Sequence, residues 1–126
     1  MATRAPLVLV VEDRASIRQL LDIALTEEGF RVVGAATAEE GLAAAKAEPP
    51  DVVLLDLLLP GPGGEALAFA LRRLPGLHRV PIVVLSGLDG GLEAARAVGA
   101  QDFVAKPFDL RDLVARIRRQ LASAPA

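Results

Sequence analysis

The chain contains no cysteine, no tryptophan and no tyrosine among its 126 residues, and its few aromatic residues, 3% of the total, are all phenylalanine. Without cysteine there can be no disulfide and no thiolate metal site. Because aromatics are scarce, the core must be built from leucine, valine, isoleucine and alanine. An excess of charge of one sign is also lacking, since 14 basic residues face 16 acidic ones. This balance does not favour general binding of nucleic acid.

Long apolar runs are absent as well, and those present are far too short for a helix that spans a bilayer. The apolar run that starts at Leu7 ends at Glu12-Asp13 without a small-residue cleavage site, which argues against a signal peptide. We therefore expect a soluble, cytoplasmic protein with no membrane partner. The length predicts a single domain over residues 1–126, with a core over about 6–121 that buries roughly two thirds of the unfolded surface.

One carboxylate, Asp56, stands between two apolar runs, Val52–Leu55 and Leu57–Leu59, and a Pro/Gly-rich stretch follows at 60–64. Four consecutive apolar residues are typical of a strand that is buried on both faces. The Pro/Gly stretch ends any regular element. Asp56 is therefore expected at the carboxyl end of a buried strand, where an ionised carboxylate costs free energy unless a positive group pairs with it.

Elsewhere, apolar runs typical of strands alternate with amphipathic segments typical of helices. Asp13 is expected to cap the first helix and Gly29 to follow its end, while Thr37 and Glu40 form a capping-box pattern and Asp109 caps the last helix. The patterns predict strands over 6–11, 30–36, 51–56, 81–85 and 101–105, helices over 14–28, 37–47, 64–74, 89–98 and 109–121, and a frayed tail over 122–126.

Five strand–helix repeats predict an α/β fold, in which a five-stranded parallel sheet with right-handed crossovers is covered by helices on both faces. In such doubly wound sheets, ligands bind outside the carboxyl ends of the strands. The polar residues that follow the predicted strands at this edge are Glu12, Asp13, Asp56, Ser86 and Lys106.

Three of these five residues are acids, which repel one another unless a cation lies among them. Oxygen ligands without histidine or cysteine favour a hard ion, and a few carboxylates together with waters suit Mg²⁺. A bound Mg²⁺ and Lys106 can neutralise charge on a transferring phosphoryl group. An aspartate such as Asp56 can accept that group as an acyl phosphate, and Ser86 can donate a hydrogen bond to one of its oxygens.

At these positions the sequence resembles the receiver domain of two-component response regulators, over about residues 6–121. The spacing of Asp56, Pro60 and Gly64 matches the family's Asp–xxx–Pro–xxx–Gly pattern. The resemblance implies a flavodoxin-like sheet with strand order 2-1-3-4-5. Each shared piece is weak alone, but together and in order they are specific: V-V-E-D (10–13), D-L-L-L-P-G-P-G-G (56–64), L-S-G (85–87), G-A-Q-D-F (99–103) and K-P-F (106–108).

The resemblance also implies a role for each matching residue. Asp56 resembles the phosphoacceptor, and Lys106 resembles the invariant lysine, which precedes a cis peptide bond to Pro107. Ser86 resembles the switch hydroxyl and Phe103 the switch aromatic residue. The implied ligands of Mg²⁺ are Asp13 directly, Glu12 through water, Asp56, and the backbone carbonyl of Leu58.

Two departures from the family pattern bear on output and on phosphoryl lifetime. The segment from Ser86 to Gly99 is about two residues shorter than usual, and Gly90-Gly91 weakens the start of its helix. In the family this helix usually belongs to the output face, so the shortening bears on the partner and on the mode of dimerisation. Leu58 and Leu88, two residues past Asp56 and Ser86, are both apolar at positions that influence access of the attacking water in the family. We therefore expect slow self-dephosphorylation.

The implied function is a signalling switch and not an enzyme. A histidine kinase or a phosphotransfer protein supplies the phosphoryl group, and the altered conformation changes contacts with a downstream protein or output domain. A homodimer is compatible with this function, and direct binding of nucleic acid is not expected. The chain is either a stand-alone receiver or a module of a longer protein.

Three other functions were weighed against the switch. A phosphatase or phosphotransferase with an aspartate nucleophile usually has a second acid two residues later, where this chain has Leu58. A flavodoxin-like cofactor binder needs a Gly/Ser/Thr-rich phosphate loop after the first strand, where this chain has Glu12-Asp13. A receiver-like scaffold that is never phosphorylated has no need of the intact set of acids, hydroxyl and lysine.

Overall fold

The computed structural model describes residues 4–61, 63–87 and 91–123. Within these residues five strands alternate with five helices, as the sequence patterns predict. The order along the chain is β1 (Leu7–Val11), α1 (Ala15–Glu27), β2 (Arg31–Ala35), α2 (Ala38–Ala47), β3 (Val52–Asp56), α3 (Gly63–Arg72), β4 (Ile82–Ser86), α4 (Gly91–Ala97), β5 (Asp102–Ala105) and α5 (Leu110–Ser123).

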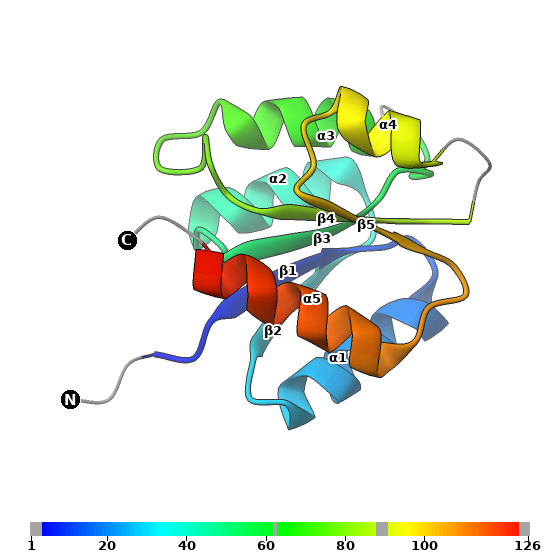
Figure 1. Ribbon diagram of the computed structural model, residues 1–126. Coiled ribbons are helices and arrows are strands. Elements are labelled where there is room, and N and C mark those ends of the chain that lie inside the picture. Colours follow the sequence, from blue (N-terminus) through cyan, green and yellow to red (C-terminus); the bar gives the residue numbers. More distant parts are fainter. Residues whose placement is uncertain (1–3, 62, 88–90, 124–126) are drawn as a thin grey trace.

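The strands form one parallel sheet in the order β2-β1-β3-β4-β5, which confirms the predicted topology. Leu9 of β1 is in register with Val33 of β2 on one side and with Val53 of β3 on the other. Figure 1 shows α1 and α5 on one face of the sheet and α2, α3 and α4 on the other. Because all five strands run the same way, their carboxyl ends meet at a single edge of the sheet.

Each face of the sheet has its own apolar core, because alternate residues of a strand point to opposite faces. Leu9 and Val11 of β1 pack with Leu67 and Leu71 of α3. Val8 and Val10 pack on the other face with residues of α1 and α5 such as Leu21 and Ile117. All five residues of β1, β3 and β4 are buried, as expected for strands covered on both sides, whereas most of the edge strand β2 is only partly buried.

Most of the predicted helix ends are confirmed. Gly29 adopts the left-handed conformation, with φ +95°, just after α1. The Oγ1 of Thr37 accepts a hydrogen bond from the amide of Glu40 at 3.1 Å, and the Glu40 carboxylate reaches back to the amide of Ala36 at 3.4 Å. Asp109 caps α5 by accepting from the amide of Arg111 at 2.8 Å.

The predicted cap of the first helix is wrong. Arg14, not Asp13, is the N-cap of α1, and its side chain makes no capping hydrogen bond. Arg14 keeps an extended backbone, so Asp13 lies one residue too early for its carboxylate to reach the amides of the first turn. The Asp13 side chain instead stays exposed at the sheet edge, where it is available to the acidic cluster described below.

Three helix boundaries differ by two residues from the sequence patterns, and most other boundaries differ by no more than one. Helix α3 ends at Arg72 and not at Leu74, and α4 spans 91–97 within the predicted 89–98, with 88–90 outside the described residues. The tail was predicted to fray from Ala122, but α5 continues through Ser123; residues 124–126 are not described. The apolar face of α1 is also wider than its buried part, because Leu20 and Ile23 remain exposed.

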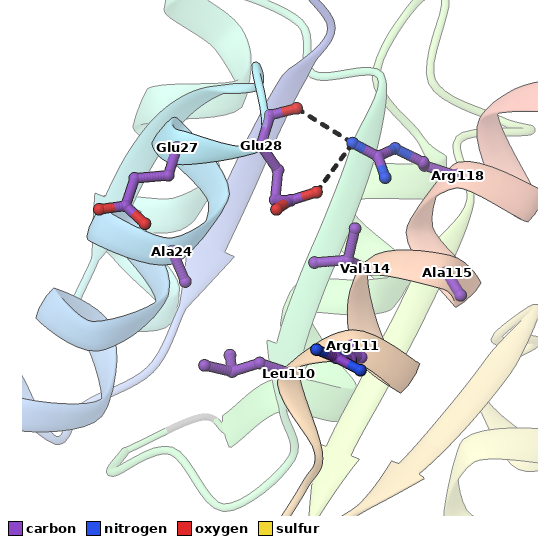
Figure 2. Close-up of a pocket in the computed structure, with 8 residues that line it drawn as sticks. All are labelled: Ala24, Glu27, Glu28, Leu110, Arg111, Val114, Ala115 and Arg118. Atoms are coloured by element: carbon purple, nitrogen blue, oxygen red, sulfur yellow. Dashed lines mark hydrogen bonds and ion pairs between the residues drawn. The ribbon is translucent and has the colours of Figure 1, made fainter.

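A groove of about 680 Å³ separates α1 from α5, and Figure 2 shows the residues that line it. Arg118 of α5 spans the groove and donates to both the carbonyl and the carboxylate of Glu28, at 3.1 and 3.0 Å. Its guanidinium also lies over the ring of Phe30, 5.6 Å from the centroid. These contacts tie α5 to the end of α1. None of the described helices is long and apolar enough to cross a membrane.

Candidate functional site

The five polar residues predicted to meet at the carboxyl edge of the sheet do so. Asp56 and Ser86 are the last residues of β3 and β4, and Lys106 follows the last residue of β5. Register pairs Asp56 with Leu85 and Ser86 with Ala105, which brings these strand ends together. Glu12 and Asp13 follow β1, and β1 pairs directly with β3. Four strands thus contribute side chains to one site.

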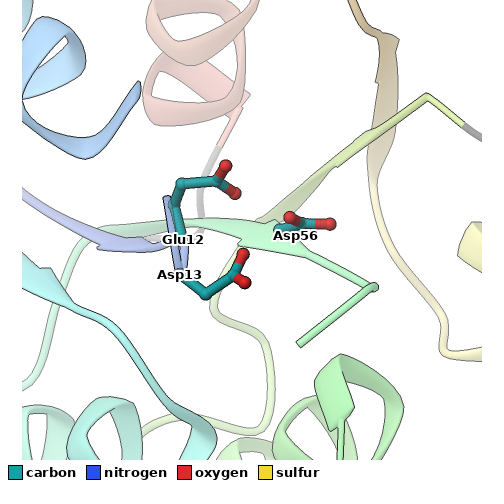
Figure 3. A group of neighbouring side chains, drawn as sticks. All are labelled: Glu12, Asp13 and Asp56. Carbon is teal, nitrogen blue, oxygen red and sulfur yellow. The ribbon is translucent and has the colours of Figure 1, made fainter. Parts of the chain in front are cut away.

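The three acids form a compact cluster. Ligand oxygens of Glu12, Asp13 and Asp56 all lie within 4.8 Å of one another. Figure 3 shows the three carboxylates gathered at the ends of β1 and β3. Glu12 is fully buried and Asp56 is only 5% exposed, whereas Asp13 is exposed. One face of the cluster is therefore closed by protein, and Asp13 stands on its open side.

Lys106 is the positive group that pairs with the buried carboxylate of Asp56. Its Nζ lies 3.2 Å from Oδ2 of Asp56, and 3.1 and 3.2 Å from the two carboxylate oxygens of Glu12. The lysine is held in turn by its backbone amide, which donates to the carbonyl of Ser86 at 2.9 Å. The peptide bond to Pro107 is cis, as the resemblance implies. One ammonium thus serves two buried carboxylates.

Burial and neighbouring groups shift the pKa values of the two buried acids, Glu12 and Asp56, in opposite directions. Burial and the hydrogen bond to Asp56 raise the pKa of Glu12 to about 7, although Lys106 acts against this rise. Burial alone would raise the pKa of Asp56 too, but hydrogen bonds from Glu12, from the Leu58 amide and from Lys106 outweigh it and lower that pKa. Near neutral pH, Asp56 is therefore the ionised member of the pair, whereas Glu12 loses its proton only around this pH when no metal is bound.

The donor set fits a hard divalent cation. Three ionised carboxylates against one ammonium leave two negative charges, which a single divalent ion neutralises. Within the described residues, the Asp13 carboxylate makes no hydrogen bond or ion pair, so its oxygens are available as ligands. Carboxylate oxygens without histidine or cysteine are the ligands that Mg²⁺ prefers. The residues present therefore fit the predicted ion.

The turn after Asp56 is held close to the strand end. The amide of Leu58 donates to Oδ1 of Asp56 at 2.9 Å, and the Leu58 side chain is 55% exposed. A Cβ at Gly64 would lie 2.6 Å from the carbonyl oxygen of Asp56 and 2.7 Å from Cα of Leu57. Only glycine allows this approach, which is the physical reason for the spacing from Asp56 to Gly64. The Leu58 carbonyl stays a predicted metal ligand.

Ser86 and Phe103 meet at the start of α4. Ser86 is buried at the end of β4, and Phe103 of β5 is partly buried. A Cβ at Gly91 would lie 2.7 Å from Cε1 of Phe103 and 3.1 Å from Oγ of Ser86. The glycine that weakens the helix start thus makes room for the aromatic ring beside the hydroxyl. Leu88, the other apolar residue singled out in the sequence, lies outside the described residues.

Sequence reasoning missed Arg18. Its Nη1 donates to the backbone carbonyl of Glu12 at 2.7 Å, so this residue of α1 acts on the acidic cluster through the backbone. In the sequence Arg18 looks like any arginine on the polar face of an amphipathic helix, and no spacing rule points from it to Glu12.

Comparison with known proteins agrees with the geometry. The model of the family described as response regulator receiver domain matches residues 8–118. The transcriptional regulatory protein AfsQ1 of Streptomyces coelicolor is 37% identical over 118 residues, which cover 92% of this chain and 51% of that protein. The DNA-binding response regulator MtrA of Mycobacterium tuberculosis is 38% identical over 123 residues, or 96% of this chain and 53% of that one.

A solved structure gives the same result at the level of the fold. The chemotaxis protein CheY4 of Vibrio cholerae is similar with a TM-score of 0.86 at 31% identity, covering 91% of this chain and 98% of that one. The chain therefore spans about half the length of the curated relatives described above, but nearly all of this smaller protein.

Proposed function

The chain belongs to the family of response regulator receiver domains, and on that premise we propose that Asp56 accepts a phosphoryl group from a histidine kinase or a phosphotransfer protein. The observation that carries the proposal is the pairing of Asp56 with Lys106 at 3.2 Å, beside Glu12 and Asp13 at the open end of the sheet. This pairing keeps a buried carboxylate ionised, oriented and ready to act as a nucleophile.

The transfer is a displacement at phosphorus. One carboxylate oxygen of Asp56 attacks the phosphorus of a phosphohistidine; the new P–O bond forms as the P–N bond breaks, and the electron pair of that bond stays on the imidazole nitrogen. The lowered pKa of Asp56 keeps its carboxylate in the reactive, ionised form. Lys106 then lies beside the oxygens on which negative charge gathers during transfer.

Mg²⁺ completes the site in this proposal. Asp13, Asp56 and the Leu58 carbonyl would bind the ion directly and Glu12 through water, and the bound ion would supply charge neutralisation for the phosphoryl oxygens. The raised pKa of Glu12 affects the binding of Mg²⁺. A Glu12 side chain that still holds its proton near neutral pH interacts more weakly with a cation. Binding of the ion therefore competes with that proton.

The signal leaves the site through Ser86 and Phe103. The Ser86 hydroxyl donates a hydrogen bond to an oxygen of the new phosphoryl group, and the Phe103 ring and the start of α4 rearrange with it. The position of both side chains beside Gly91 supports this route, since a movement of either one changes the space at the start of α4. A downstream protein or output domain, or a second receiver, then binds the altered α4–β5 surface. We assign no direct contact with nucleic acid to the receiver itself.

A hydrolytic function has less support. A phosphatase that uses an aspartate nucleophile needs a general acid near it, and the residue two positions after Asp56 is Leu58, whose exposed side chain is apolar. In this proposal, the residues described around Asp56 serve to hold a phosphoryl group, with Lys106 and Glu12 paired to each other and no polar side chain at position 58.

The test is phosphorylation of wild type and Asp56→Asn with acetyl phosphate and Mg²⁺, followed by intact-protein mass. The wild type should gain one phosphoryl group and the variant none. Asp22→Asn, which removes an exposed carboxylate of α1, is the control and should react like wild type. Because the chain has no tryptophan or tyrosine, the switch is followed by amide NMR shifts with beryllofluoride. Equal labelling of Asp56→Asn would refute the assignment of Asp56.

A further inference from the structure

Arg18 holds the backbone of the acidic cluster from outside. It lies on α1, is partly buried, and donates from Nη1 to the carbonyl oxygen of Glu12 at 2.7 Å. A charged donor on a carbonyl makes one of the stronger hydrogen bonds found in proteins. The bond reaches the peptide unit that joins Glu12 to Asp13.

The aliphatic part of the Arg18 side chain packs against a glycine of the edge strand. A Cβ at Gly34 would lie 3.1 Å from Cδ of Arg18 and 3.2 Å from its Cγ, closer than ordinary van der Waals contact. Gly34 is exposed in β2 and pairs with Val10 of β1, so its missing side chain leaves a shallow seat beside the end of β1. A Cβ there would require the Arg18 stem to shift by a few tenths of an ångström, which changes the approach of its guanidinium to the Glu12 carbonyl.

Both sides of Glu12 are thereby fixed. Its amide donates to the carbonyl of Ala35 at 3.0 Å, and its carbonyl accepts from Arg18. Asp13 follows directly, and its carboxylate makes no hydrogen bond or ion pair with the described residues. The place of the Asp13 carboxylate near Asp56 is therefore set through the backbone that Arg18 holds.

We propose that Arg18, seated over Gly34, is a positioning residue that orients the Glu12–Asp13 peptide so that Asp13 faces Asp56 and can bind a divalent cation. The inference rests on the proposed function, in which Asp13 is a metal ligand. Arg18 touches neither the ion nor the phosphoryl group and acts only through Glu12.

The direction of the change in Mg²⁺ affinity distinguishes a positioning role of Arg18 from a purely electrostatic role. Arg18→Met removes a positive charge near a cation site, and Coulomb attraction alone would make Mg²⁺ bind more tightly. Loss of a positioning contact has the opposite effect, and removal of groups that orient metal ligands weakens affinity by about tenfold or more. We expect Arg18→Met to weaken Mg²⁺ binding about tenfold, measured by calorimetry on the metal-free protein.

Arg14→Met is the matched control, because Arg14 precedes the same helix and its side chain makes no capping bond. It should leave the Mg²⁺ affinity unchanged or slightly raised. Arg18→Lys keeps the charge and a donor, and should recover part of the affinity. A thermal melt of each variant checks the fold separately from metal binding.

Gly34→Ala gives a second, independent variant that keeps every charge. Alanine suits a strand at least as well as glycine, so the fold should be as stable as wild type. Mg²⁺ affinity should nevertheless fall, with shifts in the Glu12 and Asp13 amide signals of the metal-free protein. In the double variant with Arg18→Met, Gly34→Ala should add nothing further, because both act through one contact.

The outcomes distinguish this inference from the function on which it rests. If wild type binds no Mg²⁺, the proposed function fails and the inference fails with it. If wild type binds Mg²⁺ but Arg18→Met and Gly34→Ala bind it as tightly or more tightly, the metal site stands and the positioning role of Arg18 is overturned.

Discussion

The ammonium nitrogen of Lys106 lies 3.2 Å from Oδ2 of Asp56, although 50 residues separate the two in the chain. The same nitrogen contacts both oxygens of Glu12. Lys106 is thus the cation that compensates the buried Asp56 carboxylate when no metal is bound, and also that of Glu12 once Glu12 has lost its proton. Its role in the resting protein is structural as well as chemical, because an unpaired buried charge is costly.

Lys106→Met should therefore destabilise the metal-free protein near neutral pH. We expect a loss of about 2 kcal/mol in the free energy of unfolding, less than for a fully buried pair because Glu12 can take up a proton instead. Urea denaturation measures this loss, and saturating Mg²⁺ should recover part of it. Lys46→Met is the control, since Lys46 is the only other lysine and is exposed on α2. Equal losses in the two variants would contradict the structural role.

Glu12 makes the stability of the metal-free protein depend on pH. Its pKa is about 7 in the folded protein against 4.5 for the unperturbed group. Between these values the folded state binds more protons than the unfolded state, so the free energy of unfolding falls as pH rises through this window. The contribution is complete below about pH 4.5 and is lost above about pH 7. The lowered pKa of Asp56 acts only at more acid pH, below 3.8.

Glu12→Gln removes this titration and is the variant that tests it. Between about pH 5 and pH 8, wild type should lose roughly 2 kcal/mol of stability relative to the variant. Urea denaturation in a divalent-free buffer at both pH values gives the comparison, and all other titrating groups are shared by the two proteins. Parallel pH profiles would mean that Glu12 is not the proton-binding acid.

The fold and the outline of the site were predictable because local signals agree with the tertiary structure. The apolar run before Asp56 is typical of a buried strand, and the Pro/Gly stretch after it is typical of a chain that leaves the sheet. Parallel strands then bring Asp56, Ser86 and Lys106 to one edge without any knowledge of side-chain contacts. Which of Glu12 and Asp13 is buried could not be predicted from the sequence, because both residues follow the strand. Only the packed structure shows that Glu12 turns inward.

The structural features that could not be predicted from the sequence depend on single close contacts. Arg18 and Gly34 lie on different elements, and nothing in their spacing indicates that one is seated on the other. Gly91 looked like a weak start of a helix, whereas it proves to be the place where Phe103 and Ser86 meet. The predicted cap at Asp13 is wrong for a similar reason, because the extended backbone of Arg14 keeps the Asp13 carboxylate away from the helix amides.

Gly91→Ala should disturb the switch without touching the acids. The added Cβ would meet Phe103 at 2.7 Å, so the ring must move away from Ser86 or α4 must shift. Overpacking of this kind costs about 1–3 kcal/mol. Because Gly91 is the first residue of α4, the better helix propensity of alanine, which applies to helix interiors, offsets little of this cost. Unfolding measurements together with the ring signals of Phe103 should detect both effects. Combining the change with Phe103→Leu should relieve the clash, and simple additivity of the two losses would show that the contact is unimportant.

Leu58 should set a long phosphoryl lifetime. Its amide donates to Oδ1 of Asp56 at 2.9 Å, and its side chain is 55% exposed two residues past the carboxylate. An apolar group there cannot orient a water for attack on the acyl phosphate, whereas a polar one can donate or accept the hydrogen bond that positions it. Leu58→Asn should therefore lose the phosphoryl group faster, by about tenfold, which corresponds to roughly 1.4 kcal/mol of barrier. Phosphate release after removal of acetyl phosphate gives the rate, and Ile23→Asn controls for loss of an exposed apolar side chain on α1. Phosphoryl loss in wild type as fast as in Leu58→Asn would mean that access of water is limited elsewhere in the site.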